Sequence, residues 1–87
     1  MYPLNEGDSL AKVTRYELAR GDDGITIEVR WYLGGPEAGT YTAAPLDLEG
    51  FHVSPALWGE GGTETAALRA CLEKIRHLSP SRVRAYP

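Results

Sequence analysis

One short segment, residues 25–33, constrains the fold of this chain more than any other part of the sequence. Apolar and polar side chains alternate there without a break, and the apolar ones are Ile25, Ile27, Val29, Trp31 and Leu33. Successive side chains of a β-strand point to opposite faces, so the apolar groups all lie on one side. The same positions would spread around a helix, and the β-branched residues favour a strand. The segment therefore predicts a strand whose apolar face needs a covering layer.

Weaker patterns on either side of this segment predict partner strands. Residues 10–19 alternate loosely, and residues 40–44 form a short β-prone run that Pro45 ends. Two turn clusters, residues 20–24 and 34–39, join the strands, and short connections favour an antiparallel meander. Residues 46–53 suggest a bent continuation or a short fourth strand. The glycine-rich residues 59–62 are typical of a flexible loop.

A helix is expected after this loop. Thr63 is a suitable N-cap, and Glu64 lies in the first turn, where the helix dipole favours an anion. An apolar stripe with helical spacing follows, formed by Ala67, Leu68, Cys71, Leu72, Ile75 and Leu78. Ser79-Pro80 ends the helix, and residues 82–86 are either a late edge strand or a free tail.

These elements predict an α+β fold in a single domain. The expected architecture is an antiparallel three- to four-stranded sheet with one C-terminal amphipathic helix on one face, a two-layer sandwich. With 87 residues the chain has room for one core, and we expect one domain over 1–87, with a lead-in at 1–9 and a tail at 80–87. Trp31 is expected to point into this core, opposite Leu72 and Ile75.

The sequence offers few residues for catalysis or metal binding. Its single cysteine, Cys71, excludes an internal disulfide and a cysteine-pair zinc site. His52, Asp47 and Ser54 are residue types of catalytic triads, but no nucleophile-elbow motif accompanies them. Phosphate-loop and calcium-loop spacings are also absent. We therefore expect no enzymatic activity, no cofactor and no bound metal.

Charge and hydropathy limit the location and the partners. No apolar run approaches the roughly 20 residues of a membrane helix, and no signal peptide opens the chain, so we expect a cytoplasmic protein away from the membrane. The net charge is −3, divided between an acidic body (residues 1–68, −7) and a basic end (residues 69–87, +4). The acidic pI of about 5.3 argues against nucleic-acid binding.

Protein binding fits the remaining residues best. Tyr, Trp and Arg are enriched at interface hot spots, and an acidic hairpin adds charge. The candidate partner-binding residues are Asp22, Asp23, Glu28, Arg30, Tyr32, Tyr41 and Trp58. An open sheet also has edges that can pair with another chain, so we expect a homodimer through a sheet edge. The alternative function is a small ligand-binding domain or enzyme with a pocket near His52 and Trp58.

Residues 25–78 resemble the HicB antitoxin family. The resemblance rests on the strand order, on the corner Pro45-Leu46-Asp47-Leu48-Glu49-Gly50-Phe51, and on Gly62-Thr63-Glu64 at the start of the helix. It implies a module that clamps a toxin, without the DNA-binding domain that follows in that family. The expected function is thus a regulatory module that masks a partner protein, either antitoxin-like or a small phage or mobile-element inhibitor.

Overall fold

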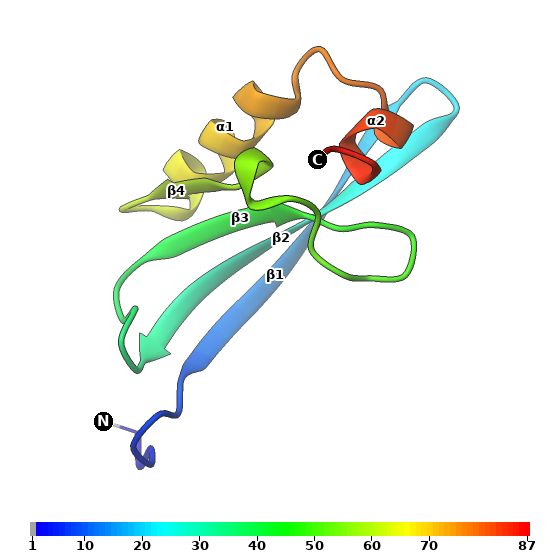
Figure 1. Cartoon of the computed structure of the whole chain (residues 1–87). Coiled ribbons are helices and arrows are strands. Elements are labelled where there is room, and N and C mark those ends of the chain that lie inside the picture. Colours follow the sequence, from blue (N-terminus) through cyan, green and yellow to red (C-terminus); the bar gives the residue numbers. More distant parts are fainter. Residues whose placement is uncertain (1) are drawn as a thin grey trace.

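A computed structural model describes residues 2–87 and shows an α+β fold. A four-stranded antiparallel sheet in the order β1-β2-β3-β4 is covered on one face by helices (Figure 1). The strands are β1 (Leu10–Arg20), β2 (Asp23–Gly34), β3 (Tyr41–Pro45) and β4 (Gly59–Gly61). A 3-10 turn, η1 (Pro55–Leu57), precedes β4, and the helices α1 (Glu64–Ile75) and α2 (Pro80–Arg84) follow. The predicted fold class is confirmed.

Strand register determines which side chains meet on each face. Ile27 lies opposite Tyr16 of β1 and Pro45 of β3, and Val29 lies opposite Thr14 and Ala43. These odd-numbered positions of β2 face the helices, as the alternation predicted. The even-numbered positions, Thr26 to Tyr32, form the other face, which we call the open face.

The core lies between the first half of β2 and the helices. It contains ten buried residues: Ile25, Ile27, Val29, Ala43, Val53, Leu57, Ala67, Cys71, Ile75 and Val83. The placement predicted for Trp31 is wrong in part. Helix α1 packs mainly on β4 and β3, so Trp31 lies beyond its cover and is only half-buried, stacked on Tyr41.

Two segments after residue 58 differ from their sequence predictions. Residues 59–61, expected to be part of a flexible loop, form β4 and pair with β3. A Cβ at Gly59 would overlap the backbone of Cys71 and Ala67, so glycine is what allows β4 to lie directly against α1. The expected tail contains α2, capped by Ser79 and held to the core by buried Val83.

The segment between β3 and η1 is a loop rather than a strand. Only one bridge, between Leu46 and His52, connects its two ends. Leu46 and Val53 are buried, whereas Leu48 and Phe51, at 83% and 68% exposed, point to solvent. In residues 46–53, which we call the 46–53 loop, His52 contacts Glu28 of the open face, whereas Val53 belongs to the core on the helix side.

Candidate functional site

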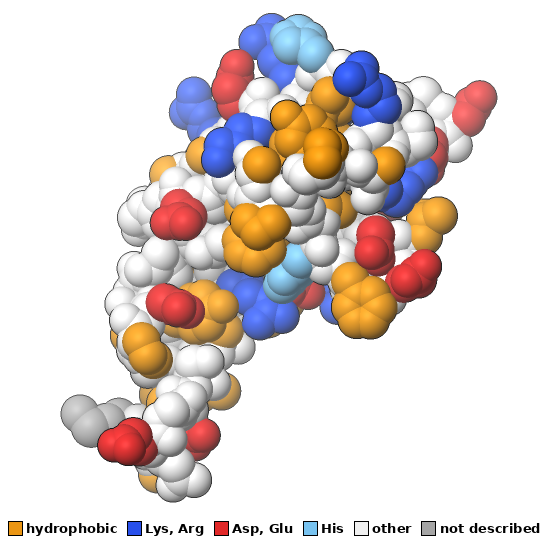
Figure 2. Space-filling view, viewed as in Figure 1, with side chains coloured by type: hydrophobic (Ala, Val, Ile, Leu, Met, Phe, Trp, Pro, Cys, Tyr) orange, Lys and Arg blue, Asp and Glu red, His pale blue; other side chains and the backbone are white. Residues whose placement is uncertain are grey.

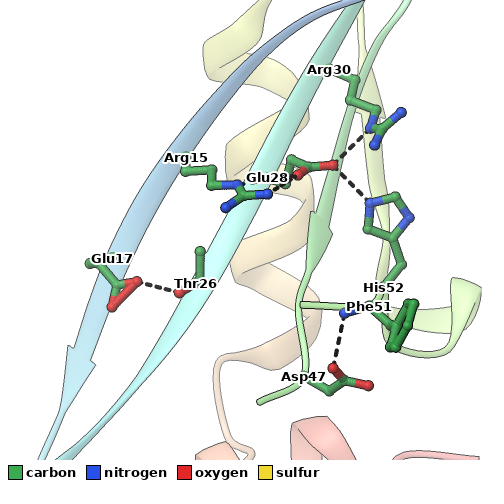
Figure 3. A network of polar contacts seen from close by, with 8 residues as sticks. All are labelled: Arg15, Glu17, Thr26, Glu28, Arg30, Asp47, Phe51 and His52. Carbon is green, nitrogen blue, oxygen red and sulfur yellow. Dashed lines mark hydrogen bonds and ion pairs between the residues drawn. The ribbon is translucent and has the colours of Figure 1, made fainter. Parts of the chain in front are cut away.

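A buried carboxylate organises the open face. Glu28, in the middle of β2, is 4% exposed. Its Oε1 accepts hydrogen bonds from Nε of Arg30 at 2.7 Å and from Nε2 of His52 at 2.9 Å. Its Oε2 lies 3.3 Å from Nη2 of Arg15 on β1 (Figure 3). Two guanidinium groups, one from β1 and one from β2, and the imidazole of a loop residue therefore converge on one carboxylate.

The surroundings of Glu28 keep it ionised. Burial raises the pKa of Glu28, but the hydrogen bonds from His52 and Arg30 outweigh burial and hold that pKa below its ordinary value. The same hydrogen bond to Glu28 raises the pKa of Arg30. Because its oxygens are occupied, Glu28 positions Arg30 and His52 and offers no free carboxylate to a partner.

The 46–53 loop carries His52 to this network. The Asp47 carboxylate accepts hydrogen bonds from the backbone N–H groups of Glu49 and Phe51, both at 2.9 Å, which closes the loop tightly. Figure 3 shows Phe51 turned away from the network while the next residue, His52, points toward Glu28. The His52 ring also packs edge-on against Trp58, with centroids 5.4 Å apart.

Beside this network the open face is hollowed. A depression of about 270 Å³ is lined by Tyr32, Glu37, Thr40, Thr42, Trp58 and Glu60, which we call the acidic hollow. Tyr32, Thr42 and Glu60 come from β2, β3 and β4, and Thr42 lies opposite Glu60 in the register. The other three side chains come from the segments that flank these strands.

The acidic hollow combines aromatic walls with free carboxylates. The indole nitrogen of Trp58 donates to the carbonyl of Val53 at 3.0 Å, which fixes the ring. Within residues 2–87, Glu37 and Glu60 take part in no ion pair. Carboxylates and the faces of aromatic rings both attract cations, so the hollow is suited to a positively charged side chain.

The predicted partner-binding residues do not form one surface. Four of the seven, Glu28, Arg30, Tyr32 and Trp58, lie on the open face, in the Glu28 network or around the acidic hollow. Tyr41 lies on the helix face, stacked on Trp31 with ring centroids 5.4 Å apart. Strand register explains the separation, because Tyr41 pairs with Trp31 and therefore shares its face.

The other two predicted residues lie at the far end of the β1–β2 hairpin. Asp22 is exposed at the turn. Asp23 is bound by Nη2 of Arg84 at 2.7 Å, and the hydrogen bond from Arg84 lowers the pKa of Asp23. Arg84 also donates to the carbonyl of Gly24, so this contact fastens α2 to the hairpin.

Sequence reasoning missed four residues of the acidic hollow, Glu37, Thr40, Thr42 and Glu60. Thr42 and Glu60 come together only through the β3–β4 pairing, and the sequence around Gly59 shows no strand signal. Glu37 lies in the turn between β2 and β3, where an acidic residue is ordinary.

The basic end is less available than its charge suggests. Figure 2 shows Lys and Arg side chains gathered over the helices, and acidic ones predominating lower in the view. Arg84 is only 15% exposed because it binds Asp23, and Arg76 lies 3.7 Å from Glu73. Two of the five basic groups of this segment thus already have acidic neighbours.

The described residues were also compared with the requirements of a metal site and of a membrane-spanning helix. Within the described part of the chain, no three His, Cys, Asp or Glu side chains are grouped so as to hold a metal ion. No helix among residues 2–87 has the length and apolar character needed to cross a membrane.

Comparison of the chain with protein-family models, curated proteins and solved structures gives no match.

Proposed function

We propose that this chain is a non-enzymatic protein-binding module that receives a basic segment of a partner protein in the acidic hollow. One observation carries this proposal: Glu37 and Glu60, which form no ion pair, lie in the same hollow as the aromatic rings of Tyr32 and Trp58. The volume of about 270 Å³ suits one or two side chains of a peptide.

The chemistry of the hollow favours Arg or Lys as the residue that is bound. A cation over an aromatic face gains roughly 0.5–2 kcal/mol, depending on its desolvation. Charge-assisted hydrogen bonds to carboxylates add to this, and Arg can form them in pairs. The acidic body of the chain would attract a basic partner over longer distances, so association should be faster at low salt.

Masking of a partner protein is the role we assign to this binding. The resemblance to HicB would make the partner a toxin, whereas a small phage or mobile-element inhibitor would cover a basic surface of a host protein. Both roles need the same surface and no catalysis. A ligand pocket near His52 and Trp58 is less well supported. Trp58 lines the hollow, but His52 does not, and Nε2 of His52 is bound to Glu28.

Peptide binding tests the proposal directly. The immobilised chain is exposed to synthetic peptides of equal length that are rich in Arg, Lys, Asp or neutral residues. We expect retention of the basic peptides, and loss of that retention in the double variant Glu37→Gln/Glu60→Gln. The control is Glu6→Gln/Glu49→Gln, which changes the net charge equally at exposed positions outside the hollow.

Several outcomes would contradict the proposal. Equal loss in both double variants would mean that only net charge attracts the peptides. Retention of acidic peptides, or of none, would also reject a basic partner. Free arginine that saturates the hollow as tightly as the peptides would instead support the small-ligand alternative.

A further inference from the structure

The sheet has one long free edge. In the order β1-β2-β3-β4 the two edge strands are β1 and β4. Strand β4 has three residues and lies against α1, whereas β1 has eleven residues, none of which is buried. The outward backbone N–H and C=O groups of β1 have no strand partner within residues 2–87, and such an edge is a template for another strand.

Strand β1 also exposes apolar side chains. Leu10, Val13 and Tyr16 are 37%, 43% and 37% exposed. Helix α1 packs mainly over β3 and β4, and it also meets side chains of β1: the Tyr16 hydroxyl donates to the Glu64 carboxylate, and Arg20 donates to the carbonyls of Ile75 and Leu78. These contacts do not use the outward backbone groups of β1, so a second strand can still approach this edge.

The charges of β1 distinguish between the ways in which two copies can pair. If the β1 strands of two copies pair antiparallel in one continuous sheet, the two-fold axis is perpendicular to the sheet. Each side chain of β1 then lies opposite a side chain of the other copy that is on the same face of the sheet. An axis through Arg15 places Arg15 opposite itself, and an axis through Glu17 places two carboxylates together. An axis through Thr14 creates no pair of opposite charges.

An axis through Tyr16 creates two such pairs. Arg15 of each copy then lies opposite Glu17 of the other, and the two Tyr16 residues lie opposite each other on the helix face, where each hydroxyl donates to Glu64 of its own copy. Opposite charges and aromatic pairs are the stabilising cross-strand combinations. Within its own copy Arg15 contacts Glu28, and the Glu17 carboxylate accepts a hydrogen bond from the Thr26 hydroxyl. The Arg15 side chain is nevertheless 64% exposed, and Glu17 is exposed as well, so the two groups can meet across the interface.

This register also brings Lys12 opposite Arg20. The Arg20 guanidinium, however, donates to the backbone carbonyls of Ile75 and Leu78 at the end of α1. Arg20 is thereby drawn toward the helix end and away from the strand edge.

We propose that β1 is the interface for a second copy of this chain, paired antiparallel over residues 12–20 of each copy with Tyr16 on the two-fold axis. The two sheets then form one eight-stranded sheet, with the helices of both copies on the same side. The acidic hollow lies over β2, β3 and β4, so it stays open in the dimer.

Sedimentation equilibrium and cysteine crosslinking test the interface and its register. At tens of micromolar we expect a species of twice 9.5 kDa. Single cysteines are placed at Thr14, Tyr16 and Leu18, and the proteins are oxidised. Directly opposed strand residues have Cα atoms about 4.5–5.5 Å apart, within disulfide range, so Tyr16→Cys should form a covalent dimer most rapidly. Buried Cys71 is present in every variant and serves as the unreactive reference.

Charge reversal gives an independent test. Arg15→Glu and Glu17→Arg each turn two opposite-charge pairs into like-charge pairs and should weaken dimerisation about tenfold or more. The double variant Arg15→Glu/Glu17→Arg restores both pairs and should restore the dimer. The double variant still lacks the contact of Arg15 with Glu28. If it dimerises, the loss in the single variants is due to the interface and not to that contact.

A wild-type chain that sediments only at 9.5 kDa would overturn the proposal. Faster crosslinking at Thr14 or Leu18 would reject the register. A dimer that no cysteine on β1 captures, or that the double variant fails to restore, would place the interface elsewhere.

Discussion

The Nε2 atom of His52 lies 2.9 Å from Oε1 of Glu28 and joins the 46–53 loop to the middle of the sheet. The contact links residues 24 positions apart in sequence. An ionised carboxylate only accepts hydrogen bonds, so Nε2 carries the proton. Because Glu28 is buried and charged, the contact acts both on the stability of the fold and on the arrangement of the open face.

Removal of the Glu28 charge should destabilise the protein at neutral pH. Glu28→Gln keeps the size of the side chain but loses the charge-assisted hydrogen bonds from Arg30 and His52. Hydrogen bonds to charged groups contribute roughly 1.5–3 kcal/mol, so the free energy of unfolding should fall by about 2 kcal/mol. Urea denaturation at pH 7 measures this change, and the exposed Glu49→Gln is the control.

The difference in stability between wild type and Glu28→Gln should become smaller as the pH falls. The pKa of Glu28 in the folded protein lies below its ordinary value of 4.5, so the unfolded chain binds the proton more readily. The stabilisation is therefore complete above about pH 5 and is lost as the pH falls through the folded pKa. The stability gap between wild type and Glu28→Gln should narrow below pH 4.5. A gap that widens in acid would contradict the assignment.

Trp31 and Ile27 should contribute differently to stability, although they share the helix face of β2. Ile27 is 1% exposed in the core, and Ile27→Ala should cost about 3 kcal/mol. Trp31 is half-buried beyond α1, and Trp31→Ala should cost about 1–2 kcal/mol, mainly through the lost stacking with Tyr41. Thermal unfolding of both variants checks the order. A larger loss for Trp31→Ala would show that α1 covers this end of the sheet.

The fold was predictable where the signal is local. The alternation from Ile25 to Leu33 depends only on side-chain period, and the Thr63 cap depends only on the first turn of the helix. The Thr63 hydroxyl indeed accepts from the N–H of Ala66 at 3.1 Å. Strand β4 was not predictable, because Gly59 and Gly61 have low strand propensity and are held in place by α1.

For the candidate site, the sequence predicts which types of residue bind a partner but not which of them lie together. Residue type alone indicates Tyr32 and Trp58 as interface residues, but Glu60 reaches them only through the β3–β4 pairing. Residue type also puts Tyr41 in one group with Tyr32, although the register places the two side chains on opposite faces. Which residues share a face across strands is fixed by the turns and bulges that set register, and the composition does not show it.

Cys71 should react with thiol reagents only when the protein unfolds. Its side chain is fully buried in the core, and burial raises the pKa of the thiol to about 11. The thiolate, which is the nucleophile, is therefore scarce at pH 8 and enclosed as well. Labelling with iodoacetamide at pH 8 should be slow in buffer and rapid in concentrated urea. Rapid labelling under native conditions would show that α1 opens from the sheet.

Gly59 should be the glycine that tolerates substitution least. A Cβ at this position would overlap the backbone nitrogen of Cys71 and the carbonyl oxygen of Ala67, and backbone atoms cannot move aside as a flexible side chain can. Gly59→Ala must therefore push β4 away from α1, at a cost of about 2–4 kcal/mol, in the range of strong overpacking. Gly62 is the matched control, because a Cβ there meets no atom within 4 Å. Denaturation midpoints should fall sharply for Gly59→Ala and stay close to wild type for Gly62→Ala. Equal tolerance of both substitutions would mean that β4 does not lie against α1, and the acidic hollow would then lose the strand that carries Glu60.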